Sequence, residues 1–176
     1  MSAGRKNNTD NKEWNTPPKY LDPIREFFDG EIDLDPCSNI NSLVNAKNNY
    51  IYPLKDGLKE KWESSKIFVN PPYGRFCGKS LYDWFNKAIV EYNSYETKDM
   101  EIIFLVPVAT NTKHFKEIVF KKFNAICFLS DTRLKFYNQG IEDKKGAPMA
   151  CCLCYLGHRK DEFNEAFSAF GKVFDI

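Results

Sequence analysis

KIFVNPPYG, at residues 66–74, is the stretch that decides the fold class of this chain. Residues 67–69 are apolar, as in a buried strand, and the two prolines that follow Asn70 lack the N–H groups needed to continue strand pairing. In open α/β sheets, ligands bind beyond the carboxyl ends of the strands. The stretch therefore predicts a strand over residues 66–69 that leads directly into a ligand-binding turn.

The sequence on both sides of this stretch alternates between helix and strand patterns. Residues 81–92 carry an apolar stripe at helical spacing, and residues 102–106 are continuously apolar, as in a strand buried on both faces. This alternation predicts an α/β fold with a mainly parallel central sheet. Further helices are expected at residues 16–28 (with Thr16 as a possible cap), 115–123 and 160–170, and further strands at residues 32–35, 125–129, 134–137 and 149–156.

The polar segment 138–148 is expected to be a loop between the last two strands. Such a loop would make residues 134–156 a hairpin and give the sheet an antiparallel edge. The same loop is a candidate to close over a bound substrate.

Length and composition limit the classes of protein that fit. The chain has 176 residues, of which 43% are apolar and 28% charged, as expected for one globular domain. No window approaches eighteen uninterrupted apolar residues, and the polar N-terminus lacks the apolar run of a signal peptide. We therefore expect a cytoplasmic protein without a membrane span, with a disordered tail at residues 1–13 and one domain at residues 14–176.

Charge and cysteine content narrow the function further. The formal charge is +1, which argues against a globally basic nucleic-acid coat protein but does not exclude a nucleic-acid enzyme, because a local basic patch suffices. The six cysteines form no matching pairs at metal-ligand spacing, so we expect reduced, buried cysteines and no metal site. They lie at positions 37, 77, 127, 151, 152 and 154.

Residues 70–73 carry the chemistry that the sequence suggests. Pro71 forces Asn70 into an extended conformation, and the carbonyl groups of both prolines are free of sheet pairing. The Asn70 side-chain oxygen and the Pro71 carbonyl can then each accept one hydrogen of a heteroaromatic amine, while the Tyr73 ring stacks on the base. A base in a duplex must be flipped out to enter such a site. The alternative is a strand ended by a proline turn, with Tyr73 packed on the core.

Several motifs, taken together in order, resemble those of the S-adenosylmethionine-dependent amino methyltransferases, whose catalytic motif is (D/N)-P-P-(Y/F/W). The chain is most similar to the phage-type, Dam-like DNA N-6-adenine methyltransferases. The resemblance implies a Rossmann-like class I methyltransferase fold. Its motifs are WNTPP at 14–18, DLDPCS at 33–38, DGL at 56–58 with Trp62, VNPPY at 69–73 with Trp84 and Ala88, LVP at 105–107 and RLKF at 133–136.

The resemblance also implies roles for individual residues. It makes Asn70, Pro71, Pro72 and Tyr73 the catalytic residues. It assigns the methionine part of the cofactor to Thr16 and Pro17, and the adenine amine of the cofactor to Asp56. The implied cofactor-binding residues are Trp14, Thr16, Pro17, Asp35, Pro36, Cys37, Asp56 and Asn70.

Simpler interpretations remain open for several of these residues. Asp35 and Asp56 are also suitable turn residues, and Trp14 is also a suitable core anchor. The glycines that usually follow Asp35-Pro36 in the first cofactor motif are absent. No acidic residue occupies the place of the usual ribose partner, for which Asn45 is a candidate.

Contacts with DNA are expected from Lys113, Arg133 and Lys135, although scattered cations are often only solvated surface. The chain is too short for a large separate domain that reads DNA sequence. The sequence thus predicts methyl transfer from S-adenosylmethionine to the adenine amine in DNA, by a monomer or weak dimer in a bacterial host or prophage-carrying cell. The alternatives are cytosine N-4, an RNA adenine or a protein glutamine as acceptor, or a catalytically inactive nucleic-acid-binding relative.

Overall fold

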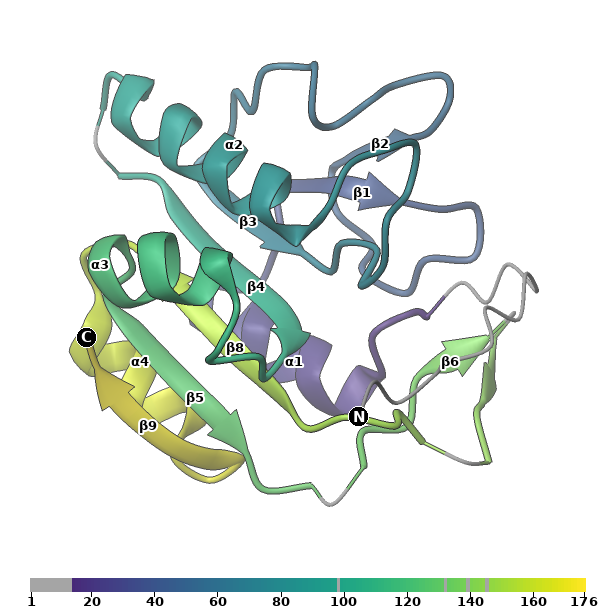
Figure 1. The fold of residues 1–176 in the computed structure, drawn as a ribbon, viewed down its shortest axis with the longest axis vertical. Helices are drawn as coiled ribbons and strands as arrows, with labels where there is room; N and C mark the ends of the chain where they lie inside the picture. Colours follow the sequence, from purple (N-terminus) through teal and green to yellow (C-terminus); the bar gives the residue numbers. More distant parts are fainter. Residues whose placement is uncertain (1–13, 98, 132, 139, 145) are drawn as a thin grey trace.

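A seven-stranded sheet forms the centre of the protein in the computed structural model (Figure 1). The structure describes residues 14–97, 99–131, 133–138, 140–144 and 146–176. The order of the strands is β2-β1-β3-β4-β8-β5-β9. The expected tail at residues 1–13 lies outside the described residues.

One half of the sheet is parallel, as predicted. It contains β2 (Asn48–Ile51), β1 (Leu34–Ser38), β3 (Lys66–Val69) and β4 (Glu101–Pro107). All neighbours in this half pair in parallel, and every residue of β4 is buried. The continuous apolar run in the sequence therefore marks a strand that is covered on both faces.

The other half of the sheet is antiparallel, and here one prediction is wrong. β8 (Cys151–Leu156) pairs antiparallel with both β4 and β5 (Ala125–Leu129), so β8 lies inside the sheet and not at its edge. The antiparallel edge strand is β9 (Gly171–Asp175). Because β5 then runs in the same direction as β4, five of the seven strands are parallel in direction.

Among the described residues of 134–156, the predicted hairpin does not form. The short strands β6 (Tyr137–Asn138) and β7 (Ile141–Glu142) instead make a separate two-stranded ribbon. An isolated antiparallel bridge joins Tyr137 of this ribbon to Asn15. Tyr137 therefore pairs both with Glu142 of β7 and with the N-terminal segment.

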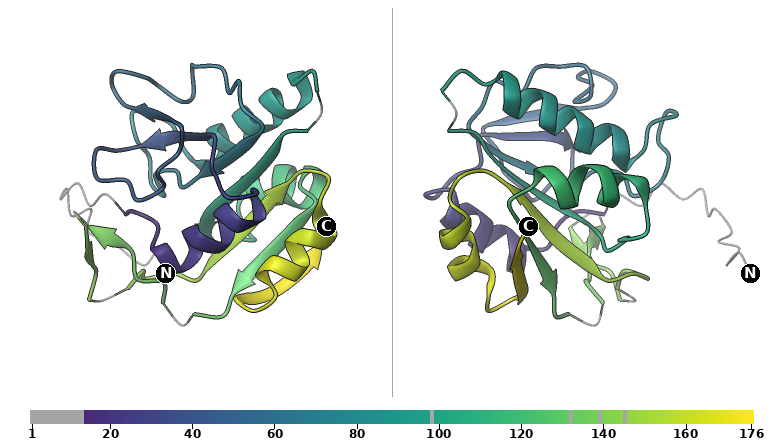
Figure 2. Two further views of the ribbon diagram at one scale, coloured as in Figure 1. Left: turned by 180° about the vertical axis from the view of Figure 1, so that it is seen from behind. Right: turned by 60° about the vertical axis from the view of Figure 1, so that its left-hand side comes forward.

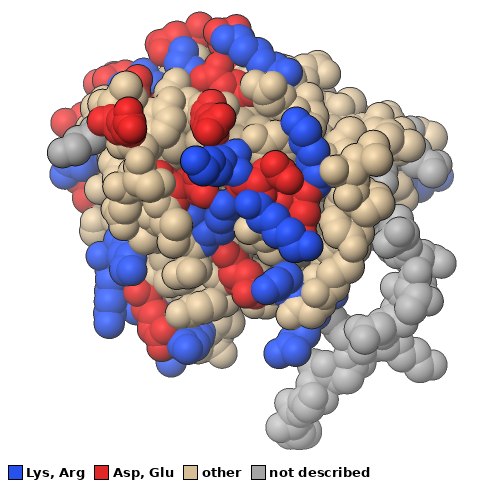
Figure 3. All heavy atoms as spheres, turned by 90° about the horizontal axis from the view of Figure 1, so that it is seen from above, with Lys and Arg blue, Asp and Glu red and all other residues tan. Residues whose placement is uncertain are grey.

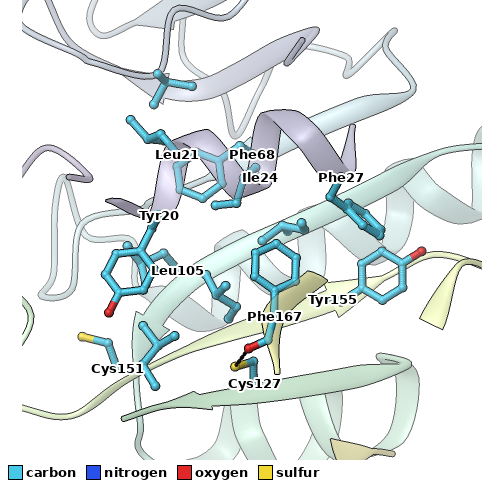
Figure 4. Packing of buried hydrophobic residues seen from close by; sticks show 14 of the residues in the cluster. Tyr20, Leu21, Ile24, Phe27, Phe68, Leu105, Cys127, Cys151, Tyr155 and Phe167 are labelled. Atoms are coloured by element: carbon cyan, nitrogen blue, oxygen red, sulfur yellow. Dashed lines mark hydrogen bonds between the residues drawn. The ribbon is translucent and has the colours of Figure 1, made fainter. Parts of the chain in front are cut away.

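Helices cover both faces of the sheet (Figure 2). On one face, α1 (Pro18–Phe27) and α4 (Lys160–Phe167) contribute to a core with Ile103 and Leu105 of β4 (Figure 4). On the other face, α2 (Leu81–Ser94) and the π-helical turn η1 (Phe115–Val119) pack with Ile102 and Phe104. The short helix α3 (Phe120–Lys122) follows η1 directly and has no buried residue. Alternate residues of β4 thus belong to two separate hydrophobic cores, one on each face of the sheet. No helix within the described ranges is long and apolar enough to cross a membrane.

The start of α1 differs from the prediction in a way that matters for the site. The N-cap of α1 is Pro17, and no side chain caps the helix, so the predicted cap at Thr16 is wrong. A proline such as Pro18 is tolerated at the first helical position, because the backbone N–H of any residue there would have no partner within the helix. The Thr16 side chain is therefore available for another contact.

Candidate active site

Three segments that are distant in sequence meet beyond the carboxyl ends of β1 and β3. They are the N-terminal segment at residues 14–17, the end of β1 at residues 35–38, and the turn at residues 70–73. The segment at residues 136–137 lies against the first of these, since the backbones of Asn15 and Tyr137 exchange two hydrogen bonds of 2.9 Å. The sheet brings together the predicted catalytic residues and most of the predicted cofactor-binding residues.

Asn70 is held by its side-chain nitrogen. Its Nδ2 donates hydrogen bonds to the backbone oxygen of Trp14 at 2.7 Å and to Oγ1 of Thr16 at 3.1 Å. A backbone carbonyl can only accept, so the amide nitrogen must be the atom that faces Trp14. The side-chain oxygen of Asn70 is thereby turned away from these contacts and remains available as an acceptor.

Tyr73 is held in place by the rings of Trp14 and Phe136, with which it forms an aromatic cluster. The Tyr73 ring makes edge contacts with Trp14 and Phe136, each at 5.8 Å between centroids, and Trp14 stacks on Phe136 at 5.3 Å. The Tyr73 hydroxyl donates to the carbonyl of Leu105 at 3.2 Å. Burial raises the pKa of Tyr73, so the phenol stays neutral. Tyr73 is half-buried, so part of its ring packs on the core as the alternative interpretation expected.

The two prolines of the turn differ in exposure. Pro71 is buried beside Asn70, whereas Pro72 is exposed. The turn therefore follows β3 as predicted, with the first proline packed into the protein and the second facing solvent.

Asp35 is a buried carboxyl group without a cationic partner in the described part of the chain. It is 4% exposed, and it accepts hydrogen bonds from the Cys37 N–H at 3.1 Å and the Ser42 hydroxyl at 3.3 Å. Burial raises its pKa to about 6, because desolvation penalises the charged form more than these hydrogen bonds favour it. Burial also raises the pKa of the neighbouring Cys37 thiol, which therefore stays protonated.

Asp56 forms a turn, as the simpler interpretation expected. Its side chain accepts a hydrogen bond from the Leu58 N–H at 3.1 Å and lies 3.5 Å from Lys59. The next residue, Gly57, packs against the end of β1, since a Cβ atom there would stand 1.8 Å from the carbonyl oxygen of Pro36. The turn at Asp56 is thus locked to the segment that contains Asp35.

Two buried donors in the N-terminal segment have no partner among the described residues. They are Nε1 of Trp14 and Nδ2 of Asn15. Asn15 also accepts a hydrogen bond from Nδ2 of Asn39 at 2.6 Å, which ties this segment to the chain beyond β1. The motif at residues 14–18 includes Asn15, but no sequence signal pointed to the contact of Asn15 with Asn39. Asn45, the candidate ribose partner, is exposed and has a φ of 50°.

The three predicted DNA-contacting cations do not lie together. Arg133 and Lys135 line a pocket of about 420 Å³ with Pro17 and Tyr137, next to the N-terminal segment. Lys113 instead lies over the Tyr82 ring of α2 at 4.9 Å. Figure 3 shows the protein from above relative to the view of Figure 1, and on this face basic and acidic side chains are interspersed.

Two of these cations are partly neutralised. Lys113 pairs with Glu117 at 3.7 Å, and Lys135 pairs with Glu142 at 3.2 Å. Arg133 is exposed and forms no ion pair within the described ranges. In the part of the chain that the structure describes, no group of three or more His, Cys, Asp or Glu residues is arranged to hold a metal ion.

Comparison with known proteins gives one match. A family model described as DNA N-6-adenine-methyltransferase (Dam) matches residues 3–172. No curated protein and no solved structure gives a significant match. The matched range includes every segment of the site described above.

Proposed function

The chain belongs to the DNA N-6-adenine-methyltransferase (Dam) family, and we propose that it binds and methylates adenine around Asn70, beyond the carboxyl end of β3. The activity of the family is transfer of a methyl group to the exocyclic amine of adenine in DNA, with S-adenosylmethionine as the usual donor. The observation that carries the proposed site is the orientation of Asn70, whose nitrogen is held by Trp14 and Thr16.

The oriented oxygen of Asn70 suits the chemistry of an aromatic amine. The lone pair of the adenine amine is delocalised into the ring, so the nitrogen is a poor nucleophile. Hydrogen bonds from its two hydrogens to Asn70 Oδ1 and the Pro71 carbonyl favour a tetrahedral nitrogen with a directed lone pair. Tyr73 then supplies a ring surface for the base, and Pro72 keeps the turn rigid.

Asp35 supports a cationic cofactor at the end of β1. S-Adenosylmethionine supplies an electrophilic methyl group on a positively charged sulfur, and its methionine part carries an ammonium group. A buried carboxyl group without a cationic partner among the described residues fits such a ligand, because the ligand would supply that partner. The proposed cofactor-binding residues are Trp14, Thr16, Pro17, Asp35, Pro36, Cys37, Asp56 and Asn70.

The topology agrees with this position for the cofactor. From β1 the chain continues to β2 on one side, while β3 and β4 lie on the other side. In open α/β sheets, ligands bind at such a reversal of strand order, beyond the carboxyl ends. We therefore assign the chain a Rossmann-like methyltransferase fold, with the cofactor between the ends of β1 and β3.

The DNA substrate has to present its adenine outside the helical stack, since a paired base cannot reach Asn70. We propose Arg133 and Lys135 as phosphate contacts beside the site, and Lys113 as a more distant one. We further propose one domain at residues 14–176, a monomer or weak dimer, and action in the cytoplasm of a bacterial or prophage-carrying cell. No observation favours cytosine, RNA or protein glutamine as the acceptor, or an inactive relative.

The decisive experiment is incubation of the protein with labelled S-adenosylmethionine and with DNA, RNA or protein. Label in the adenine of DNA is expected, and base-resolution mapping then identifies the target site. Label on protein alone would contradict the DNA activity. Absence of label from every acceptor, together with no cofactor binding by calorimetry, would contradict the enzymatic function.

A further inference from the structure

The segment directly after the catalytic turn forms a tight hairpin. The backbones of Phe76 and Lys79 exchange two hydrogen bonds, of 3.0 and 2.9 Å. The two residues between them, Cys77 and Gly78, have φ values of 48° and 76°. Positive φ at both central positions is the signature of a type I′ turn, which joins two strands with only two residues. The hairpin therefore holds Phe76 in a defined position.

Phe76 is a large apolar side chain that the fold leaves exposed. It is 43% exposed, and its partner Tyr52, from the loop after β2, is 49% exposed. The two rings meet edge to face at 5.2 Å, and the Cys77 thiol lies 3.5 Å from the Tyr52 hydroxyl. We call Tyr52 and Phe76 the aromatic tip. The two rings contact each other but are not covered by the core. Exposed apolar groups of this kind are typical of surfaces that bind a partner.

Cations flank the aromatic tip. Arg75 and Lys79 precede and follow the turn, and both are exposed. Lys79 is 4.0 Å from Asp83, whereas Arg75 has no ion-pair partner among the residues described. An exposed aromatic ring between two cations matches the chemistry of nucleic acid, in which stacked bases are bordered by phosphates.

We propose that the aromatic tip is a wedge that enters the DNA duplex beside the target adenine, with Phe76 as the inserting side chain. Proteins that unstack DNA insert apolar side chains of this kind between base steps. Phe76 is three residues from Tyr73, so their Cα atoms lie within about 11 Å of each other. A ring at this distance fits the space next to a base that has left the stack for the pocket at Asn70. The inference rests on the proposed function, since it requires a flipped adenine.

The test compares duplex substrates that differ in the cost of flipping. The substrates are a duplex with one mapped target site, the same duplex with an abasic position opposite the target adenine, and the single strand. For Phe76→Ala, we expect methylation of the intact duplex to fall about tenfold or more, because the variant loses help with unstacking. Methylation of the other two substrates should stay within about twofold of wild type, since little unstacking remains to be done.

Two further variants separate a wedge from a general loss of structure. Phe76→Trp keeps a large ring and should retain most of the duplex activity. Phe174→Ala removes a similarly exposed phenylalanine, 49% exposed, from the edge strand β9, and should leave all three rates unchanged. With 2-aminopurine at the target position, the fluorescence increase on binding should be smaller for Phe76→Ala than for wild type.

Full duplex activity of Phe76→Ala would overturn the wedge. Equal loss on all three substrates would overturn it as well, because the side chain would then serve folding or the catalytic turn. If the wild-type protein methylates none of the substrates, the failure lies with the proposed function and not with the wedge.

Discussion

The side-chain nitrogen of Asn70 donates a 2.7 Å hydrogen bond to the backbone oxygen of Trp14, 56 residues earlier in the chain. In the proposed site, this contact decides which end of the amide would face the substrate, because a carbonyl partner accepts only a donor. The N-terminal segment is therefore part of the proposed catalytic geometry, in addition to its proposed contact with the cofactor.

Removal of the Asn70 amide should abolish methyl transfer. We expect Asn70→Ala to lower kcat on the order of 100-fold or more, because the acceptor of the amine hydrogen is lost. Cofactor affinity measured by calorimetry should stay near wild type, since Asn70 is only one of several residues around that site. Full activity in this variant would mean that the chemistry takes place elsewhere.

Aspartate at position 70 should work poorly here, although related motifs accept it. The carboxylate of Asn70→Asp has no hydrogen to donate and would place an oxygen against the carbonyl of Trp14. We expect a lower kcat than wild type at pH 8, with partial recovery as the pH falls and the acid becomes a donor. A pH profile of kcat for both proteins checks this, and a constant ratio between them would contradict it.

The Thr16 hydroxyl should act as a positioning group for Asn70. It accepts the second hydrogen bond from Nδ2 at 3.1 Å. We expect Thr16→Val, which keeps the shape, to lower kcat about tenfold, and Thr16→Ser, which keeps the hydroxyl, to restore it. If Thr16 served the cofactor alone, the valine variant would instead raise the KM for the cofactor and leave kcat unchanged.

Much of the sheet could be predicted from local patterns. Apolar runs and helical stripes correctly predicted β3, β4, β8 and α2, because these elements are buried and carry their periodicity in their own residues. The edge strands β2 and β9 were missed. Both are largely exposed, so their residues do not show the apolar pattern of a buried strand.

The site was predictable in its parts but not in its contacts. The turn at residues 70–73 lies directly after the buried strand β3, as its prolines predicted, and its catalytic role stays a proposal. The link between Thr16 and Asn70 did not follow, because Thr16 looks like a helix cap in sequence and the two residues are brought together only by the sheet. Outside the site, the close approach of Gly171 on β9 to β5 was also hidden in the sequence, because it too arises only when the sheet forms. A Cβ atom at Gly171 would lie 2.1 Å from the carbonyl oxygen of Phe128 on β5.

Cofactor affinity should depend on pH through Asp35. With a pKa of about 6 in the free protein, Asp35 is largely ionised at pH 7.5 and protonated at pH 5. A cationic cofactor prefers the ionised form, so its affinity should rise as the pH increases through 6. Calorimetry of wild type and Asp35→Asn checks this. The variant should bind weakly at all pH values, and an equal slope in both proteins would contradict the role of Asp35.

Asp35 should have the opposite effect on the stability of the free protein. Its pKa is raised from 3.8, so its contribution to stability is fully present below pH 4 and is lost as the pH rises through about 6. Asp35→Asn should therefore stabilise the cofactor-free protein at pH 7.5, on the order of 2 kcal/mol, and have little effect at low pH. Denaturant unfolding at both pH values measures this difference.

The contact between Gly57 and Pro36 should be needed for stability. In Gly57→Ala, the added Cβ would meet the Pro36 carbonyl at 1.8 Å, and neither backbone can move without disturbing β1. We expect a loss of about 1–3 kcal/mol in the free energy of unfolding. Gly74→Ala is the matched control, since a Cβ there has no atom within 4 Å. Equal stability of the two variants would show that β1 adapts to the extra atom.

The three proposed phosphate contacts should differ in strength, because their neighbours differ. Arg133 forms no ion pair within the described ranges, whereas Glu142 already neutralises part of the charge of Lys135, and Glu117 part of that of Lys113. A contact that releases a counterion contributes about 0.9 to the slope of log affinity against log salt. Arg133→Ala should therefore lower that slope by nearly this amount and raise the KM for DNA severalfold.

Substitutions of three other cations provide the comparison for the salt dependence of Arg133→Ala. Lys135→Ala should have a smaller effect, and Lys113→Ala the smallest of the three, because a cation paired in the free protein must give up its partner to bind a phosphate. Lys172→Ala, on the edge strand β9, removes an exposed cation that does not line the pocket of Arg133 and Lys135, and should leave the slope unchanged. Titration of DNA binding from low to high salt gives all four slopes. If Arg133→Ala behaves like Lys172→Ala, the DNA backbone does not pass over the pocket beside Pro17, and the path of the strand must be sought nearer to Arg75 and Lys79.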